Sequence, residues 1–260
     1  MSESRTFLCF HWNNGFRDYR PEHVNILARA ILAKCPFPHR FVCITEETDG
    51  FSSDVEVMPL PKEAEAVARI KSVEGDRFPS SYRRLWALSD AARCLGDRVM
   101  MLDIDCAVTA DLGPLFEYEQ DFVGWRPNSS WGSKWKKRVG GGTWLLRTGT
   151  CAHIWSDFVS DPMVLIKRAR AADYRGSDQA ILSFYLAETC TVWPQDAGIY
   201  QAQQMRSHGF KQLPKDARIV HFNGGRKPWD IKNIPWIAEA MNPVAEYGRI
   251  ERRIAALEHA

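Results

Sequence analysis

The sequence lacks an apolar run long enough to cross a membrane. No segment has the roughly 18 consecutive apolar residues that a transmembrane helix requires. Its first apolar stretch, residues 6–10, is shorter than the hydrophobic core of a secretory signal peptide. We therefore expect a cytoplasmic protein without an integral membrane segment.

An excess of charge of one sign is also missing. The chain has 34 Lys and Arg against 32 Asp and Glu, a formal net charge of +2. So small a charge does not favour nucleic acid or an anionic membrane as the main partner. The hydrophobic content of 45% and the charged content of 25% are ordinary for a globular protein.

Paired cysteines are absent as well. The seven cysteines are scattered, with no Cys-x-x-Cys pair and no zinc-type spacing, so we expect free thiols in a reducing compartment. The chain of 260 residues can bury a substantial core, and its composition forces no division. We expect one domain over residues 1–260, in which residues 230–260 form a C-terminal helical extension.

Short β-like runs alternate with amphipathic helical ones, which is typical of an α/β sheet with helices on its faces. Strands are expected at residues 6–10, 40–45, 55–58, 99–102, 122–125, 143–146 and 217–222. Helices are expected at residues 21–35, 82–95, 150–159, 178–188 and 236–257, the last interrupted at Asn242-Pro243. Ser80 or Ser81 can cap the second helix, and Gly96 can end it in the left-handed conformation.

The apolar run 99–102 ends at Asp103-Ile104-Asp105. In an extended strand, side chains at i and i+2 point to the same side, so both carboxylates can converge on one hard cation. Ligands of open α/β sheets bind just beyond the carboxyl ends of strands. Two exposed turn carboxylates would look the same, so this Asp-x-Asp pattern alone is a weak signal.

A second apolar stretch closes at His221, which Gly224, Gly225 and Lys227 follow. An imidazole can ligate a metal, glycines allow close backbone approach, and a lysine supplies a point charge for phosphate. Together with the aspartate pair, the segment predicts a site for a metal and a diphosphate. The alternative is a satisfied strand histidine followed by a simple turn.

The segment His221-x-x-Gly224-x-x-Lys227-Pro228-Trp229 resembles the signature of the retaining glycosyltransferases of family 8, of the glycogenin and galactosyltransferase type. Further similar stretches are Phe37-Pro38-His39-Arg40-Phe41-Val42, Tyr82-Arg83-Arg84-Leu85, Leu102-Asp103-Ile104-Asp105 and Gly176-Ser177-Asp178-Gln179-Ala180-Ile181-Leu182. The resemblance covers residues 6–229 and implies an α/β protein with the single-domain GT-A fold, a Rossmann-like mixed sheet flanked by helices.

The resemblance implies a metal site formed by Asp103, Asp105 and His221. The ion would be Mn²⁺, or Mg²⁺ in its place, and it would hold both phosphates of a UDP-sugar. Oxygen ligands with one imidazole suit these ions better than a soft metal. Lys227 and backbone amides near Gly224 would help to stabilise the charge that develops on the departing diphosphate.

The resemblance also assigns residues to the donor. Arg84 matches a basic position that contacts the phosphate or the sugar. The alternative is that Arg84 is an ordinary arginine on the surface of a helix. Tyr19 corresponds to a tyrosine that stacks on the base. The segment His11-Trp12-Asn13-Asn14 departs from the Thr-Asn pattern usual there, which leaves base specificity open.

Asp178 and Gln179 match a pair that faces the donor sugar and its anomeric carbon. A retaining transfer either uses a carboxylate nucleophile in two displacements or proceeds by a front-face route, in which the departing phosphate helps to deprotonate the acceptor. The sequence leaves both routes open. Asp178 could also be the N-cap of its helix.

Two segments depart from the family or stand outside its motifs. The run Gly140-Gly141-Gly142 replaces an Asn-x-Gly-Val segment whose amide helps to hold the sugar, so sugar preference should differ. The run lacks a Gly-Lys-Ser/Thr ending and is therefore not a phosphate-binding P-loop. Residues 125–138 combine tryptophans with basic residues, which indicates either an acceptor loop for an anionic ligand or a solvated loop with tryptophan anchors.

We therefore expect an enzyme that moves a hexose from a UDP-sugar to a hydroxyl group of a glycan, a lipid or another acceptor, with no nucleic-acid partner. A metal-dependent nucleotidyltransferase is the enzymatic alternative, since it also uses paired aspartates near a sheet edge. A catalytically silent nucleotide-sugar or glycan-binding module on the same fold is the other alternative.

Overall fold

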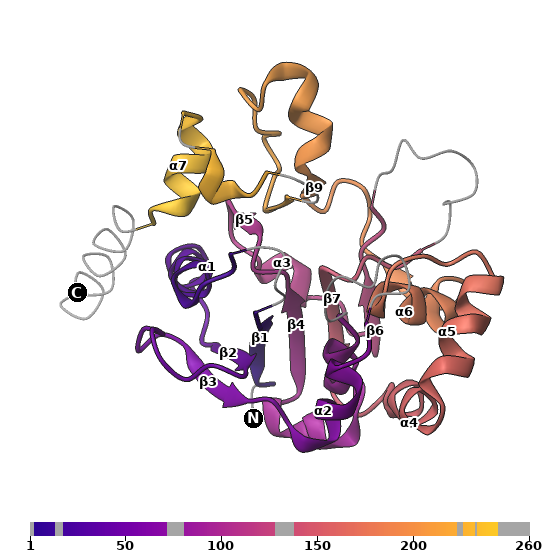
Figure 1. Cartoon of the computed structure of the whole chain (residues 1–260). Helices are drawn as coiled ribbons and strands as arrows, with labels where there is room; N and C mark the ends of the chain where they lie inside the picture. Colours follow the sequence, from indigo (N-terminus) through magenta and orange to yellow (C-terminus); the bar gives the residue numbers. More distant parts are fainter. Residues whose placement is uncertain are drawn as a thin grey trace.

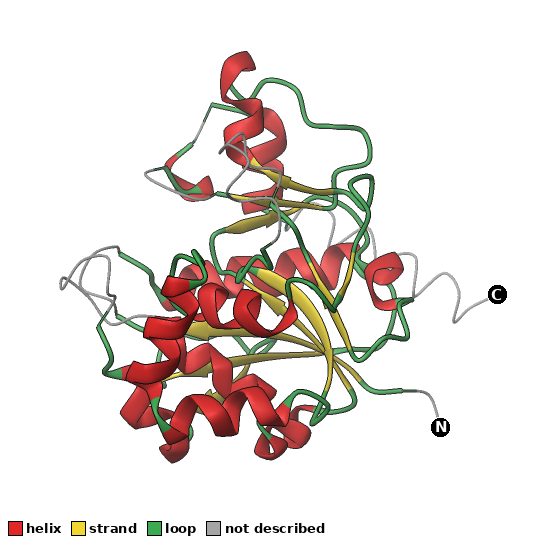
Figure 2. Cartoon of the chain, turned by 90° about the vertical axis from the view of Figure 1, so that its right-hand side faces the viewer, coloured by secondary structure: helices red, strands yellow, loops and turns green. Residues whose placement is uncertain are grey.

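The computed structural model describes residues 3–13, 18–71, 81–127, 138–222, 226–231 and 233–243. A seven-stranded sheet forms the centre of the protein, and a three-stranded sheet lies beyond one end of it (Figures 1 and 2). The strands are β1 (Arg5–His11), β2 (Arg40–Thr45), β3 (Glu56–Pro59), β4 (Arg98–Leu102), β5 (Cys106–Val108), β6 (Phe122–Gly124), β7 (Thr143–Arg147), β8 (Thr191–Val192), β9 (Ile199–Gln201) and β10 (Ile219–His221). The expected α/β architecture is confirmed.

The large sheet has the strand order β3-β2-β1-β4-β7-β6-β8. Strands β1 to β4 are mutually parallel, whereas β7 runs antiparallel to both of its neighbours and β6 pairs with β8 in parallel. Because parallel strands end at the same edge of a sheet, the residues after β1, β2 and β4 gather there. Asp103 follows β4 at this edge.

Helices cover both faces of the large sheet (Figure 1). The helical elements are α1 (Pro21–Lys34), α2 (Lys62–Ala68), η1 (Ser81–Leu88), η2 (Asp90–Leu95), α3 (Gly113–Phe116), α4 (Ala152–Ser160), α5 (Pro162–Ala171), α6 (Asp178–Leu186), η4 (Ala202–His208), η5 (Pro228–Asp230) and α7 (Pro235–Met241). Strand β4 shows how the core divides, since Val99 and Met101 pack with α4 to α6 while Met100 and Leu102 pack with α1.

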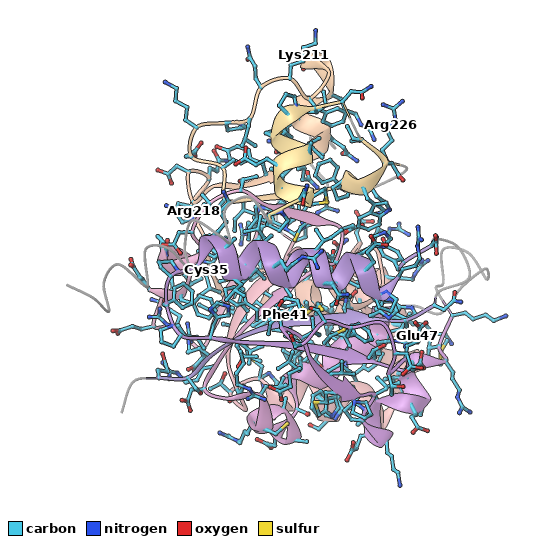
Figure 3. All side chains as sticks on the ribbon, turned by 90° about the vertical axis from the view of Figure 1, so that its left-hand side faces the viewer. Cys35, Phe41, Glu47, Lys211, Arg218 and Arg226 are labelled. Carbon is cyan, nitrogen blue, oxygen red and sulfur yellow. The ribbon has the colours of Figure 1, made fainter. Side chains whose placement is uncertain are left out.

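Helix α1 follows from its sequence. Pro21 occupies the first turn, where its missing N–H costs nothing. The predicted stripe is buried as expected, and its members are Val24, Leu27, Ala28, Ile31 and Cys35. Figure 3 shows α1 crossing in front of the sheet with Cys35 at one end.

The helix predicted over residues 82–95 is wrong. The structure has two 3₁₀ helices, η1 and η2, which separate at Ser89, whose backbone is extended (φ −66°, ψ 161°). The apolar spacing continues through both pieces, so periodicity alone could not detect the break, and serine is a weak helix former. Gly96 does have a positive φ of 106°, but its ψ of −170° lies outside the left-handed helical region.

The small sheet has the order β5-β10-β9, with β10 antiparallel to β5 and parallel to β9. Its residues pack against η4 and α7 in a separate hydrophobic cluster. His221 pairs with Cys106, the residue after Asp105. This pairing brings the two motifs of the sequence to one place.

The C-terminal expectation is met in part. Helix α7 spans Pro235–Met241 and has Asn242 as its C-cap, so it ends at the predicted interruption. Residues 244–260 lie outside the described residues, so the helical extension stays a prediction. All seven cysteines are free, as expected. In the described part of the chain, no helix has the length and apolarity to traverse a bilayer.

Candidate functional site

The candidate site lies where the end of β4 meets the start of β7 and the end of β10. The backbone N–H of Asp103 donates to the carbonyl of Gly142 over 2.9 Å. The N–H of Phe222 donates to the carbonyl of Asp105 over 3.1 Å. The Asp-x-Asp turn is thus held from both sides by backbone hydrogen bonds.

Arg84 connects Asp103 with Asp178. Its Nη1 donates to Oδ1 of Asp103, and its Nη2 lies 2.7 Å from Oδ2 of Asp178. Burial of this side chain, only 11% exposed, opposes its charge, but the two carboxylates outweigh burial and raise the pKa of Arg84. Burial also raises the pKa of Asp178, against the lowering effect of Arg84. The arginine is a permanent cation between two acidic groups.

A second cation lies at Asp105. The ammonium group of Lys227 donates to Oδ2 of Asp105 and to the carbonyl of Phe222, the latter over 3.1 Å. The hydroxyl of Tyr19 donates to the same carboxylate oxygen over 3.0 Å. The lysine Nζ is also 5.6 Å from the centre of the Tyr19 ring, within the range of a cation–π contact. Tyr19 and Lys227 therefore converge on Asp105.

His221 is buried beside the aspartates. Its Nε2 lies 2.8 Å from the hydroxyl oxygen of Thr143, and this hydroxyl donates to the carbonyl of Gly142 over 2.8 Å. With the hydroxyl hydrogen directed at that carbonyl, Nε2 is the donor to Thr143 and Nδ1 keeps its lone pair. That buried Nδ1 has no hydrogen-bond partner within the described ranges. Burial lowers the pKa of His221, against the raising effect of both aspartates.

Trp125 completes the surroundings of this histidine. Its ring stacks on the imidazole with centroids 4.5 Å apart and an interplanar angle of 22°. The indole excludes water from one face of the ring. His221 is thus held in position by a hydrogen bond at its edge and an aromatic contact on its face.

The glycine run forms one wall of the site. A Cβ atom at Gly142 would lie 2.5 Å from Oδ2 of Asp103 and 3.2 Å from Cε1 of His221. A Cβ at Gly141 would lie 3.0 Å from Oδ2 of Asp178. Any larger residue would displace the carboxylates, which gives this run a steric role.

Two cavities meet at the Arg84–Asp103 pair. One, of about 170 Å³, is lined by Phe10, Trp12, Tyr19, Ser81, Arg84, Asp103, Ile104 and Asp105. The other, of about 240 Å³, is lined by Ser81, Arg84, Asp103, Trp125, Pro127, Arg138, Gly140, Gly141, Gly142, Gly176, Ser177, Asp178, Gln179 and His221. The first is rich in aromatic side chains and the second in polar ones. The shared pair separates two halves of one depression at the sheet edge.

The predicted metal ligands can be tested against this geometry. Among the side chains that the structure describes, no three His, Cys, Asp or Glu groups converge to form a metal cluster. Asp103 and Asp105 are turned toward Arg84 and Lys227. The chemistry of the donor set still fits a hard divalent ion, because two carboxylates lie beside an imidazole with an unpartnered Nδ1. The metal set remains a prediction.

The structure brings most of the predicted site residues together. Those that it places in or around the two cavities are Tyr19, Arg84, Asp103, Asp105, Asp178, Gln179, His221 and Lys227. Gln179 donates from its amide to the carbonyl of Arg175 over 3.2 Å. Asp178 is not the N-cap of α6, since Ser177 holds that position. Gly224 lies outside the described residues, as do Trp131 and Trp135 of the tryptophan-rich segment.

Sequence reasoning missed the supporting roles of Thr143 and Trp125. In the sequence, Thr143 is only part of a predicted strand, and Trp125 is only part of the tryptophan-rich segment 125–138. Their contacts with His221 link residues far apart in the chain, so no local pattern could reveal them. Trp12 was noted only as a departure from the family, yet it lines the first cavity.

No protein-family model matches the chain, and no curated protein matches its sequence. Among solved structures, the chain is similar to the galactosyltransferase LgtC, whose structure holds donor and acceptor sugar analogs. The TM-score is 0.63 at 13% identity, covering 92% of this chain and 95% of LgtC. It is also similar to the glycosyltransferase GlyE of Streptococcus pneumoniae (TM-score 0.59, 14% identity, 93% and 63% covered). A third similar structure is mouse xyloside xylosyltransferase 1. Its TM-score is 0.53 at 15% identity, covering 85% of this chain and 98% of the xylosyltransferase. The chain therefore has the GT-A fold of these proteins.

Proposed function

We propose that this GT-A protein is a glycosyltransferase that moves a hexose from a UDP-sugar to a hydroxyl acceptor with retention of configuration, using Mn²⁺ or Mg²⁺. The observation that carries the proposal is the Arg84 bridge between Asp103 and Asp178, which lies where two cavities meet. Its structural neighbours, all named as glycosyltransferases, support the same class.

The donor nucleotide fits the first cavity. Tyr19 and Trp12 offer aromatic surface for a base. Arg84 and Lys227 supply two buried cations beside the Asp-x-Asp turn, where a diphosphate would lie. Because such charges gain strength in a dry site, they would stabilise the diphosphate as it leaves.

Asp103, Asp105 and Nδ1 of His221 would hold the divalent ion. Bound there, the ion supplies Lewis-acid neutralisation of the diphosphate charge. Two roles belong to the chain itself. Thr143 keeps the proton of His221 on Nε2, and Trp125 keeps water from the ring.

The sugar and the acceptor fit the second cavity. Asp178 and Gln179 line it from the start of α6, and Gly141 leaves room beside them. Arg84 fixes the orientation of the Asp178 carboxylate. We propose that Asp178 faces the anomeric carbon; either retaining route is compatible with this position.

The test is nucleotide release from a panel of nucleotide sugars, with Mn²⁺ or with a chelator. We expect metal-dependent UDP release from one sugar, and an Asp105→Asn variant should lose it. Asp90→Asn, an exposed carboxylate outside the cavities, is the matched control and should keep full activity. The anomeric configuration of the product, read by NMR, tests retention.

The alternatives give different products. Release of diphosphate from a nucleoside triphosphate would identify a nucleotidyltransferase. Mn²⁺-dependent binding of a nucleotide sugar without turnover of any acceptor would identify a binding module. Full transfer activity in Asp178→Ala would contradict the role given to that carboxylate.

A further inference from the structure

The corner between α4 and α5 carries an unusual group of exposed side chains. Within the described residues, the exposed large apolar side chains are Val159, Met163 and Val164, with exposed fractions of 40%, 51% and 49%. All three fall within six positions of the chain. Single exposed apolar residues are ordinary, whereas a contiguous group of them marks an interaction site.

Helix α5 explains why these residues face outward. The carboxylate of Asp161 caps it by accepting from the N–H of Val164 over 3.0 Å. Leu165, Ile166 and Ala169 turn into the core. Met163, Val164, Lys167 and Arg168 are exposed and share the opposite side of the helix at the i, i+4 spacing. We call these four residues, with Val159, the corner face.

The corner face is apolar at its start and basic at its end. Over residues 159–175 the chain has four basic residues, Lys167, Arg168, Arg170 and Arg175, and two acidic ones, Asp161 and Asp173. Asp161 is engaged in the helix cap, and Asp173 pairs with Arg175 over 3.2 Å. Arg175 is engaged by the same pair, so Lys167 and Arg168, the latter with its Cζ 5.3 Å from the centre of the Phe184 ring, give the exposed side of α5 its positive charge. This side complements a negatively charged partner that can also accept apolar side chains.

A bilayer with anionic lipid has both properties. Apolar side chains of a surface helix enter the headgroup boundary while long basic side chains extend to the phosphates. We propose that the corner face docks the protein onto an anionic lipid bilayer, without crossing it. The net charge of +2 for the whole chain hides this local concentration of positive charge.

Docking at the corner face also bears on the acceptor. This inference rests on the proposed transferase function. Helix α5 packs against α6, whose first residue, Asp178, lines the second cavity (Figure 1). Gly176 and Ser177, between the two helices, line it as well. A docked protein would thus be held to the bilayer through the helix that precedes one wall of the sugar-side cavity, an arrangement that favours a lipid-linked hydroxyl acceptor.

The test is co-sedimentation of the full chain with vesicles of phosphatidylcholine alone and of phosphatidylcholine with phosphatidylserine. We expect binding only to the anionic vesicles. The pair Lys167→Gln and Arg168→Gln should weaken binding about 25-fold, since each basic residue near such a surface contributes about fivefold. The pair Met163→Gln and Val164→Gln should also weaken it several-fold.

The matched control is the pair Lys211→Gln and Lys215→Gln, which removes the same charge from the part of the chain that follows η4 (Figure 3). It should leave vesicle binding unchanged, and circular dichroism should show all variants folded. Equal loss in the control pair would mean that only net charge matters. Absence of vesicle binding, or unchanged binding in both corner-face pairs, would overturn the proposal. Sedimentation needs no transfer, so failure of the proposed activity would not affect this result.

Discussion

At the scale of single residues, the site is a balance of buried charges. Arg84 neutralises Asp103 and Asp178, and Lys227 neutralises Asp105. A carboxylate moved into the interior without a cation loses several kcal/mol of solvation. The same cations are suited to bind phosphate, which is the role toward the donor that we propose for them.

Removal of Arg84 should therefore destabilise the fold. Arg84→Gln leaves the buried carboxylate of Asp178 and the partly buried one of Asp103 without their shared cation, and we expect the free energy of unfolding to fall by about 3 kcal/mol. Arg93→Gln removes an exposed arginine paired with Asp90 and should cost less than about 0.5 kcal/mol. Urea unfolding of both variants measures the difference. Similar losses in the two would show that the Arg84 bridge contributes no more than a surface pair.

Thr143 offers a test of the metal set. Thr143→Val keeps the shape but removes the oxygen that accepts from Nε2 of His221, so the ring loses its fixed tautomer. If His221 is a ligand, Mn²⁺ affinity should fall by about 10-fold to 100-fold. This is the usual loss when a residue that hydrogen-bonds to a metal ligand is removed. Electron paramagnetic resonance of free Mn²⁺ measures this directly.

The matched change is Thr148→Val, just beyond the end of β7, whose hydroxyl donates to the carbonyl of Gly96 away from the cavities. It should leave Mn²⁺ affinity unchanged. If Thr143→Val and Thr148→Val behave alike, His221 does not depend on Thr143 for metal binding.

At the scale of elements, the connection into β2 depends on a partly buried histidine. His39 donates from Nδ1 to the carbonyl of Phe37 over 2.8 Å and packs edge-on against Phe7. Burial lowers the pKa of His39, against the raising effect of its hydrogen bond. The folded protein therefore prefers the neutral ring at this position.

This preference predicts a pH dependence. In the unfolded chain, His39 takes up a proton near the ordinary histidine pKa of about 6.5. In the folded chain it takes up that proton only at lower pH. The contribution of His39 is thus fully present above about pH 6.5 and is lost as the pH falls toward the folded pKa. His39→Asn should reduce the loss of stability between pH 8 and pH 5, measured by urea unfolding. His153→Asn, at an exposed position on α4, is the control, and an unchanged profile in His39→Asn would contradict the prediction.

At the scale of the whole molecule, the reactivity of the cysteines indicates how tightly the core is packed. Those that are buried are Cys9, Cys35, Cys43, Cys106 and Cys151, whereas Cys94 is exposed. Burial raises the pKa of Cys35 to about 12 and that of Cys151 to about 11. The thiolate is the reactive form, so the thiols of Cys35 and Cys151 are both shielded and protonated.

We therefore expect iodoacetamide at pH 8 to label Cys94 first. The five buried thiols should react only when the protein unfolds, and peptide mass spectrometry after a short pulse distinguishes them. Cys94→Ser should leave little rapid labelling. Fast modification of Cys35 or Cys43 in the native protein would show that the face covered by α1 opens far more easily than the packing implies.

Local patterns in the sequence were sufficient for much of this protein. The strands ending near Asp103 and His221, the helix begun by Pro21 and the Asp-x-Asp turn all follow from periodicity and residue chemistry within a few positions. The ordered motifs were enough to anticipate the GT-A fold that the structural comparisons show. Such features are encoded locally, so they can be predicted without knowing which distant segments contact one another.

Tertiary structure alone decided how the site is held. The Arg84 bridge to Asp178, the Thr143 contact with His221 and the break at Ser89 all depend on which surfaces pack together. Helix α5 and the strands β5 and β9 were likewise not predicted, because these short segments gain stability from distant partners. Propensity and spacing describe neighbours in sequence, whereas burial, charge pairing and tautomer are set by neighbours in space.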